Sequence, residues 1–323
     1  MALADHPAWR RPVTLPERHP HPPRLAGGCG PSQFHVGARR CLARRCLARR
    51  PPMRSRKENL AMDLMICTGG EPEALPFLPE IAGLGAGIEL GSYGMVGVQS
   101  EQHWQVRLAL HRAIRSRFRG PIAVHGPFIG MQYAHIDHLL RDAVNRRLDM
   151  TFDVAVQLGA SRVVLHSGYG PEIDLFGLQD SWLERCGEFW QEESRRWAGA
   201  GIEVVLENDT EQSPDPLVRL VREVDSPFLG LCLDVGHQHL FSALDAPEWV
   251  RRMGRWLRHV HLHDNDGTHD SHAPLGHGTI DLEPFYAAIS RQTPQATISL
   301  EVVAGMEAKM ADLRRLAARF APR

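Results

Sequence analysis

The feature that most constrains the fold is an alternation of short apolar runs with longer segments of helical periodicity, which begins at Leu64. Most of the runs are continuous stretches of Val, Ile and Leu, as is typical of parallel strands covered on both faces. The eight runs cover residues 64–69, 87–91, 121–128, 162–168, 202–209, 229–237, 259–264 and 297–302.

The segments between the runs have the spacing of amphipathic helices. In 138–158, apolar residues such as Leu139, Ala143 and Leu148 recur at intervals of three to five, and 179–200 and 306–320 behave alike. Eight strand–helix units in about 260 residues predict a single α/β domain over 62–323, a (β/α)8 TIM barrel. A doubly wound open sheet is the alternative, but no Gly-rich dinucleotide fingerprint follows the first run.

The N-terminal segment differs in composition from the rest. Residues 1–60 carry 13 Lys and Arg against 3 Asp and Glu, whereas the remainder carries 24 against 35. Pro-rich and tandem RRCLA sequence predicts a disordered extension over 1–61. The alternatives are a basic tail that binds nucleic acid or membrane, a transit peptide, or a true start at Met53, Met62 or Met65.

Composition also bounds the setting. The chain has no apolar stretch near the roughly 18 residues of a membrane span and no apolar segment of a secretory signal, so we expect a cytoplasmic protein. The six cysteines include no C-x-x-C pair and indicate no disulfide framework.

Metal-type side chains occur where the predicted strands end. The active sites of such barrels lie at the carboxyl ends of the strands, and carboxylates with imidazoles suit zinc, manganese or cobalt. A single such residue usually bonds only to its own loop, but six consecutive strands supplying one donor each indicate a metal site. The donors are His125, His166, Glu207, Asp234, His261 and Glu301.

Three further donors follow the sixth and seventh strands. His237 belongs to the DVGH segment, and Asp270 and His272 lie in HVHLHDNDGTHDSHAPLGHG, residues 259–278, which holds six histidines. Asp270 and His272 are spaced to point the same way from an extended loop, which Gly276 and Gly278 let turn back over the site. They could bind further metals or contact substrate.

Seven segments in order resemble a known family: VHGPF, VVLHSG, VLEND, LCLDVGH, HVHLHDND, DSHAPLGHG and ISLEV. They are similar to those of the xylose isomerase-like TIM barrel superfamily, which includes sugar isomerases and epimerases as well as AP endonucleases of the endonuclease IV type. The resemblance extends over about residues 64–320.

The resemblance implies roles for these residues. If this chain resembles the epimerase-like members, one divalent cation would be held by Glu207, Asp234, His261 and Glu301. Mn or Zn is then expected in preference to Co or Mg. Glu207 and Glu301 would also exchange protons with the substrate through a metal-stabilised enediolate. If it resembles the endonuclease IV-type members, three zinc ions would be held by these four residues together with His125, His166, His237, Asp270 and His272.

We therefore predict a metal-dependent isomerase or epimerase of a small sugar, sugar phosphate or keto compound. Expected partners are a carbohydrate-like small molecule and a second copy of the chain, but neither nucleic acid nor membrane. The alternative is an AP endonuclease, which the net charge of residues 61–323 disfavours because phosphates need a basic surface. The loop GSYGMVGVQS also lacks Arg and Lys. A non-catalytic binding barrel is a third reading.

Overall fold

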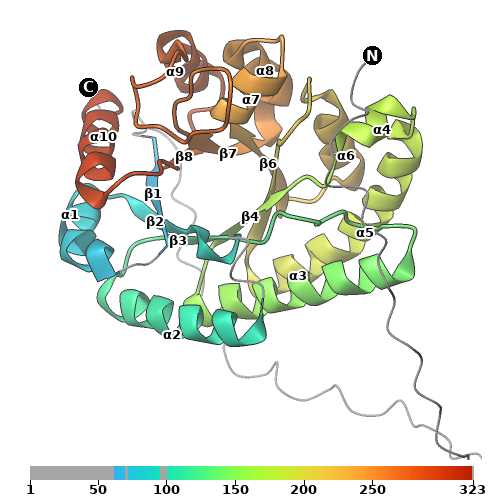
Figure 1. Ribbon diagram of the computed structural model, residues 1–323, viewed down its shortest axis with the longest axis horizontal. Helices are drawn as coiled ribbons and strands as arrows, with labels where there is room; N and C mark the ends of the chain where they lie inside the picture. The colour runs from blue at the N-terminus through green and yellow to red at the C-terminus, as the bar shows by residue number, and fades with distance from the viewer. Residues whose placement is uncertain (1–61, 70–71, 95–99, 322–323) are drawn as a thin grey trace, which may run out of the picture. The chain divides into compact units, whose positions relative to one another are not determined.

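The computed structural model describes residues 62–69, 72–94 and 100–321, and the prediction about residues 1–61 lies outside this part. Within it, eight parallel strands close into a barrel in sequence order, with β8 paired to β1. Helices surround the ring of strands (Figure 1). The predicted TIM barrel is confirmed. The strands are β1 Leu64–Thr68, β2 Gly87–Leu90, β3 Ile122–His125, β4 Arg162–His166, β5 Glu203–Glu207, β6 Leu229–Asp234, β7 Leu257–Leu262 and β8 Thr297–Leu300.

The long helices agree closely with the helical periodicity of the sequence. Two of them end at a glycine with positive φ, Gly159 at 60° and Gly201 at 72°, a conformation that favours glycine and stops a helix. The main helices are α1 Leu78–Gly83, α2 Glu101–Arg117, α3 His138–Leu158, α5 Gln179–Ala200, α6 Asp215–Val224, α8 Ala246–Met253, α9 Leu282–Gln292 and α10 Met306–Arg319. The connecting segments add α4 Pro171–Leu175, α7 Val235–Phe241 and the 3-10 turns η2 Pro72–Phe77, η3 Gly91–Tyr93 and η5 Gly254–Trp256.

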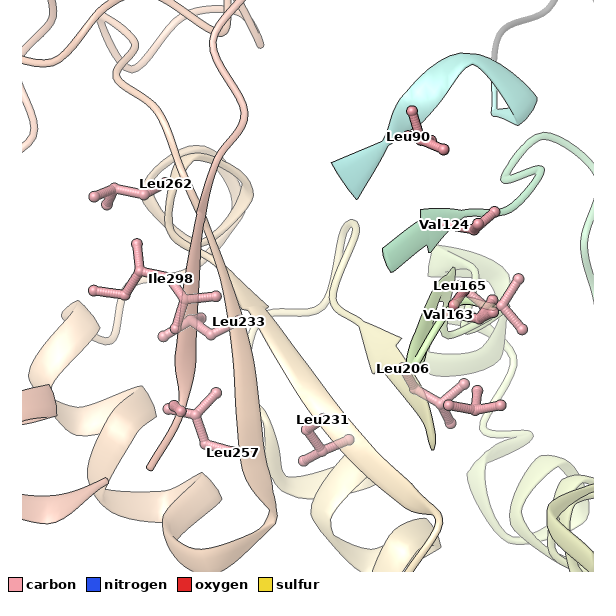
Figure 2. Close-up of a cluster of buried hydrophobic side chains, with 14 of the residues drawn as sticks. Leu90, Val124, Val163, Leu165, Leu206, Leu231, Leu233, Leu257, Leu262 and Ile298 are labelled. Carbon is pink, nitrogen blue, oxygen red and sulfur yellow. The ribbon is translucent and has the colours of Figure 1, made fainter. Parts of the chain in front are cut away.

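The core has two layers, because alternate residues of a strand face opposite sides of the barrel. Outward side chains such as Val163, Leu165 and Leu206 belong to the large cluster between strands and helices. Figure 2 labels members of this cluster on strands β2 to β8. Inside the barrel, Val164, Val205 and Cys232 form a separate small cluster. The interior positions above this plug, toward the carboxyl ends of the strands, are polar.

Two findings bear on the compositional expectations. In the part of the chain that the structure describes, no helix is long and apolar enough to cross a membrane. The cysteines of that part, Cys67, Cys186 and Cys232, are buried free thiols.

Candidate functional site

The barrel brings the six strand-end donors to one rim. The strand register pairs His166 with Glu207 and Asp234 with His261, so these side chains lie at the same level of the barrel. On β4 and β5 the donor is the last interior residue, two positions beyond the apolar plug residues Val164 and Val205. The carboxyl ends of the strands therefore carry a ring of imidazoles and carboxylates.

Three carboxylates converge on the Nδ1 atom of His261. Oε1 of Glu207 lies 2.8 Å from it, Oε2 of Glu301 2.9 Å and Oδ2 of Asp234 3.9 Å. One ligand atom from each of the four lies within 4.8 Å of the others, which is close enough to share one cation. We call Glu207, Asp234, His261 and Glu301 the central set.

A second group shares Glu207 with the central set. The other carboxylate oxygen of Glu207, Oε2, lies 3.2 Å from Nε2 of His125 and 3.6 Å from Nε2 of His166. Glu207 thus presents one oxygen to each group, as a carboxylate that bridges two cations would. We call His125, His166 and Glu207 the His125 set.

A third group lies on helix α7, which follows β6, and on the loop after β7. Oδ2 of Asp270 lies 2.8 Å from Nε2 of His272 and 3.3 Å from Nε2 of His237. These three residues also meet the distance condition for a shared cation. We call them the loop set. All nine donor positions named from the sequence therefore fall into three adjoining sets.

Each of the five histidines has its second ring nitrogen occupied on the side away from its set. His125 contacts Gly126 O at 2.8 Å, His237 contacts Asn208 O at 2.9 Å and His272 contacts Glu301 O at 2.8 Å. The partners of His261 and His166 are Glu89 Oε1, at 2.9 Å, and Asp209 Oδ2, at 3.4 Å. Carbonyl or carboxylate partners of this kind fix the tautomer and ring orientation of metal-binding histidines.

The donor set fits a divalent cation. Oε2 of Glu301 is buried and has no hydrogen-bond partner among the described residues, although it faces His261. A buried carboxylate oxygen without a partner is costly unless a cation or a proton compensates it. Imidazole and carboxylate donors in this ratio suit zinc or manganese.

The pKa values of the candidate ligands are shifted by burial and by the charges of one another. Burial opposes charging of His125 and His272, yet contacts with Glu207 and Asp270 respectively raise each pKa to about 9. Burial likewise opposes ionisation of Glu207, but the charge of His261 holds its pKa well below the usual range. Without a cation, protons on the histidines therefore balance the carboxylates.

The loop that carries Asp270 and His272 is held by Asp264. This buried carboxylate accepts hydrogen bonds from the backbone N–H groups of Asn265, Gly276 and Ile280 at 2.9, 2.9 and 3.2 Å. His272 adopts a φ of 45°, which is strained for a residue other than glycine. The loop thus stores strain at a candidate ligand.

Two residues that contact the candidate ligands were not predicted from the sequence. Glu89, on β2, is fully buried and contacts His261, and Asp209 contacts His166. A lone carboxylate within the apolar strand GIEL was the available signal for Glu89. Of the other histidines of the 259–278 stretch, His259 and His263 are buried beside the site, whereas His269 and His277 are exposed.

A cavity of about 160 Å³ adjoins the His125 set. The ring of Phe128 stacks on His166 with centroids 5.0 Å apart, which gives the cavity an aromatic wall next to a candidate ligand. A ligand that reached the rim could place a small group here. The cavity is lined among others by Phe128, Met131, His166, Tyr169, Asp209 and Thr210.

Comparison with known proteins defines the class. Residues 87–319 match the family model described as xylose isomerase-like TIM barrel. The match covers more than half of the chain and includes strands β2 to β8. The chain therefore belongs to the xylose isomerase-like TIM barrel family, as the sequence motifs suggested.

The relatives of this chain include proteins described as endonucleases and as epimerase-like proteins. A protein of Mycobacterium leprae described as probable endonuclease 4 is 27% identical over 184 residues, 52% of this chain and 68% of its own. The chain spans 66–68% of the length of the first curated relatives it matches. The TTHB071 protein of Thermus thermophilus, whose crystal was soaked with ZnCl2, is 30% identical with a TM-score of 0.61 over 80% of this chain and 99% of that one. A D-tagatose 3-epimerase-like protein shares the fold at 22% identity, with a TM-score of 0.63 over 80% of this chain and 98% of that one.

Proposed function

We propose that this protein is a divalent-metal-dependent isomerase or epimerase of a small polyhydroxylated carbonyl compound. The observation that carries the proposal is the convergence of Glu207 and Glu301 on one imidazole nitrogen of His261, at 2.8 and 2.9 Å. Two carboxylates at one cation site can both bind the ion and reach a substrate held by it. That is what proton transfer between adjacent carbons requires.

The glutamates come from different sides of the site. Glu207 ends β5 and Glu301 follows β8, with β6 and β7 between them. Burial opposes ionisation of Glu301, but the charge of His261 lowers its pKa, as it does for Glu207. In the cation-free site both carboxylates are therefore ionised at neutral pH, and both can bind a divalent cation. A bound divalent cation would supply polarisation of the substrate carbonyl and stabilisation of an enediolate.

The mouth of the barrel favours a substrate without phosphate groups. In sequence, the eight segments that follow the strands contain thirteen Asp and Glu but no Lys or Arg. Recognition of phosphate normally uses Arg, Lys or a helix N-terminus. The carboxylate of Asp209, which lines the cavity beside the His125 set, suits hydroxyl donors instead. The segments are 69–77, 91–100, 126–137, 167–178, 208–214, 235–245, 263–281 and 301–305.

A second function, hydrolysis of a phosphoester, is favoured by one specific observation. Glu207 divides its oxygens between the central set and the His125 set, and the loop set adjoins both. Neighbouring cations that share a carboxylate are typical of sites that stabilise the attacking and leaving oxygens of phosphoryl transfer. The acidic mouth opposes this reading for DNA, because a polyanion needs a surface that neutralises phosphates.

The two proposals differ in an assay with pure protein. We expect cation-dependent exchange of a C–H proton of a keto sugar with heavy water, followed by NMR, and loss of exchange in Glu301→Gln. Metal analysis accompanies the assay, with about one ion per chain expected for the isomerase and three for the hydrolase. Incision of an abasic-site duplex by the wild type, abolished in Glu301→Gln, would instead establish the second function and contradict the first.

A further inference from the structure

A chain of buried polar groups runs through the barrel interior to the central set. Glu89, on β2, and His259, on β7, are both fully buried. Oε2 of Glu89 lies 2.8 Å from Nε2 of His259, and Oε1 lies 2.9 Å from Nε2 of His261. One carboxylate therefore joins two histidines of the same strand, only one of which belongs to the central set.

The far end of this chain determines where the proton of His259 lies. Nη1 of Arg162 is 3.0 Å from Nδ1 of His259, and Arg162 is itself held by Glu203 Oε2 at 2.8 Å. A guanidinium group only donates hydrogen bonds, so Nδ1 of His259 must accept one. The proton of a neutral His259 is then on Nε2, where it is donated to Glu89.

The same reasoning applies to His261 at the near end. Glu89 Oε1 accepts a hydrogen bond from Nε2–H of His261. In the neutral ring this leaves the lone pair on Nδ1, the nitrogen that faces Glu207, Asp234 and Glu301. A carboxylate that accepts from the remote nitrogen also makes the ligating nitrogen more basic.

We propose that Glu89 is a positioning residue for the metal centre. With His259 and Arg162 behind it, Glu89 holds His261 in the tautomer and orientation in which Nδ1 can bind a divalent cation. The inference rests on the cation site of the proposed function but not on the reaction. It assigns a role to a fully buried carboxylate whose partners lie 170 and 172 residues away in the sequence.

A rival reading is that Glu89 is itself a ligand. Glu89, His259 and His261 offer atoms within 4.8 Å of one another. A cation there would need the Nε2 lone pair of His259, which would move the ring proton to Nδ1 and point it at the donors of Arg162. This repulsion disfavours the rival, and ion stoichiometry tests it.

The experiment measures zinc binding by the full-length protein. Metal-stripped wild type and Glu89→Gln are titrated against a chromophoric chelator, and ion content at saturation is measured by elemental analysis. The amide introduced by Glu89→Gln can accept from one histidine but presents N–H donors to the other, so we expect zinc affinity to fall about 10- to 100-fold. The number of ions at saturation should not change. At a zinc concentration that saturates the wild type, imidazole 15N shifts should show His261 as Nε2–H with Nδ1 bound to zinc in the wild type and only partly so in Glu89→Gln.

Two further variants make the result specific. Arg162→Met removes the remote donor without touching the central set, and we expect a smaller loss of affinity in the same direction. Glu211→Gln is the matched control, because Glu211 is equally buried near the mouth but contacts Ser167 and Asp209, and its affinity should equal that of the wild type.

Several results would overturn the proposal. They are an unchanged affinity in Glu89→Gln, the loss of one whole ion per chain, and a wild type that binds no divalent cation. A wild type that binds zinc tightly but catalyses neither proton exchange nor incision would contradict only the proposed function. The two failures are therefore distinguishable.

Discussion

At the scale of single residues, Glu207 is the group on which two of the three donor sets depend. Its Oε1 atom faces His261 and its Oε2 atom faces His125, whereas Glu301 contributes a side-chain oxygen to the central set and contacts the loop set only through its backbone carbonyl. A change at Glu207 should therefore affect more cation sites than the same change at Glu301.

The first prediction compares Glu207→Gln with Glu301→Gln. Losing a charged donor should weaken cation binding by more than the roughly 10- to 100-fold typical of losing an outer partner. For a site with three ions we expect Glu207→Gln to impair two of them and Glu301→Gln one, whereas with one ion the two variants should lose it alike, measured as ions retained after dialysis against a chelator. Equal retention by the two variants would contradict a bridging role for Glu207.

The strand-end donors and Glu89 differ in how far the sequence alone predicts their roles. The six strand-end donors could be named because a barrel brings consecutive strand ends to one rim, so position along each strand is enough. The role of Glu89 could not be predicted, because its contact with His261 depends on the level at which β2 and β7 face each other across the interior. Such cross-barrel distances are set by packing, and a strand of four residues carries no sign of them.

At the scale of elements, the turn from β6 into α7 is fitted to the site by a glycine. A Cβ atom on Gly236 would lie 2.0 Å from Cε1 of His263. The Nε2 atom of His263 in turn contacts both oxygens of Asp234, at 3.1 and 3.2 Å. The DVGH segment therefore needs glycine because a ring that holds a candidate ligand fills the space.

The second prediction concerns Gly236→Ala. The methyl group must displace His263, so we expect a loss of about 1–3 kcal/mol in the free energy of unfolding and weaker cation binding at the central set. Urea denaturation and chelator titration measure the two effects. Gly187→Ala in α5 is the control, because nothing lies within 4 Å of its Cβ position and alanine favours a helix interior. A Gly236→Ala protein as stable as the control would refute the steric argument.

The third prediction concerns the loop between β7 and α9. Asp264→Ala leaves the backbone N–H groups of Asn265, Gly276 and Ile280 without their acceptor. Buried donors left unpaired cost about 1–3 kcal/mol each, less whatever water restores. We expect reduced stability and, if the loop set binds an ion, selective loss of that ion, seen by elemental analysis. Asp266→Ala, on the exposed part of the same loop, should change neither.

Element boundaries were predictable to different degrees. The ends of α3 and α5 agree with the sequence pattern because a long apolar periodicity stops at a glycine that ends the helix. The short helices α4 and α7 were not predicted. Each is five to seven residues long, and α7 begins inside the segment read as the sixth strand, where the side chain of Asp234 caps it by accepting from His237 N–H.

At the scale of the whole barrel, the fold separates stability from chemistry. The outer core covers the outward face of the strands along their length, the apolar plug lies inside on β4, β5 and β6, and the polar rim lies at the interior carboxyl ends. Burying this many ionisable groups is tolerable only while opposite charges, protons or cations compensate one another. The stability of the metal-free protein should therefore depend on pH through the rim.

The fourth prediction is the pH dependence of that stability. The pKa values of His125 and His272 are raised to about 9 in the folded protein, against about 6.5 in an unfolded chain. A raised pKa contributes stability that is fully present below pH 6.5 and is lost as the pH rises through about 9. We expect the metal-free protein to lose about 5 kcal/mol between these limits, roughly half from each imidazole, measured by urea denaturation in a chelator.

Zinc should reverse this trend, because a bound cation replaces the protons that balance Glu207 and Asp270. In saturating zinc we expect stability to hold or rise over the same pH interval, since binding competes with fewer protons. His272→Gln, which lacks one of the two titrating rings, should show a shallower alkaline loss when metal-free. A metal-free wild type of constant stability from about pH 6.5 to 9 would mean that the rim histidines are not charged, and the compensation argument for the site would fail with it.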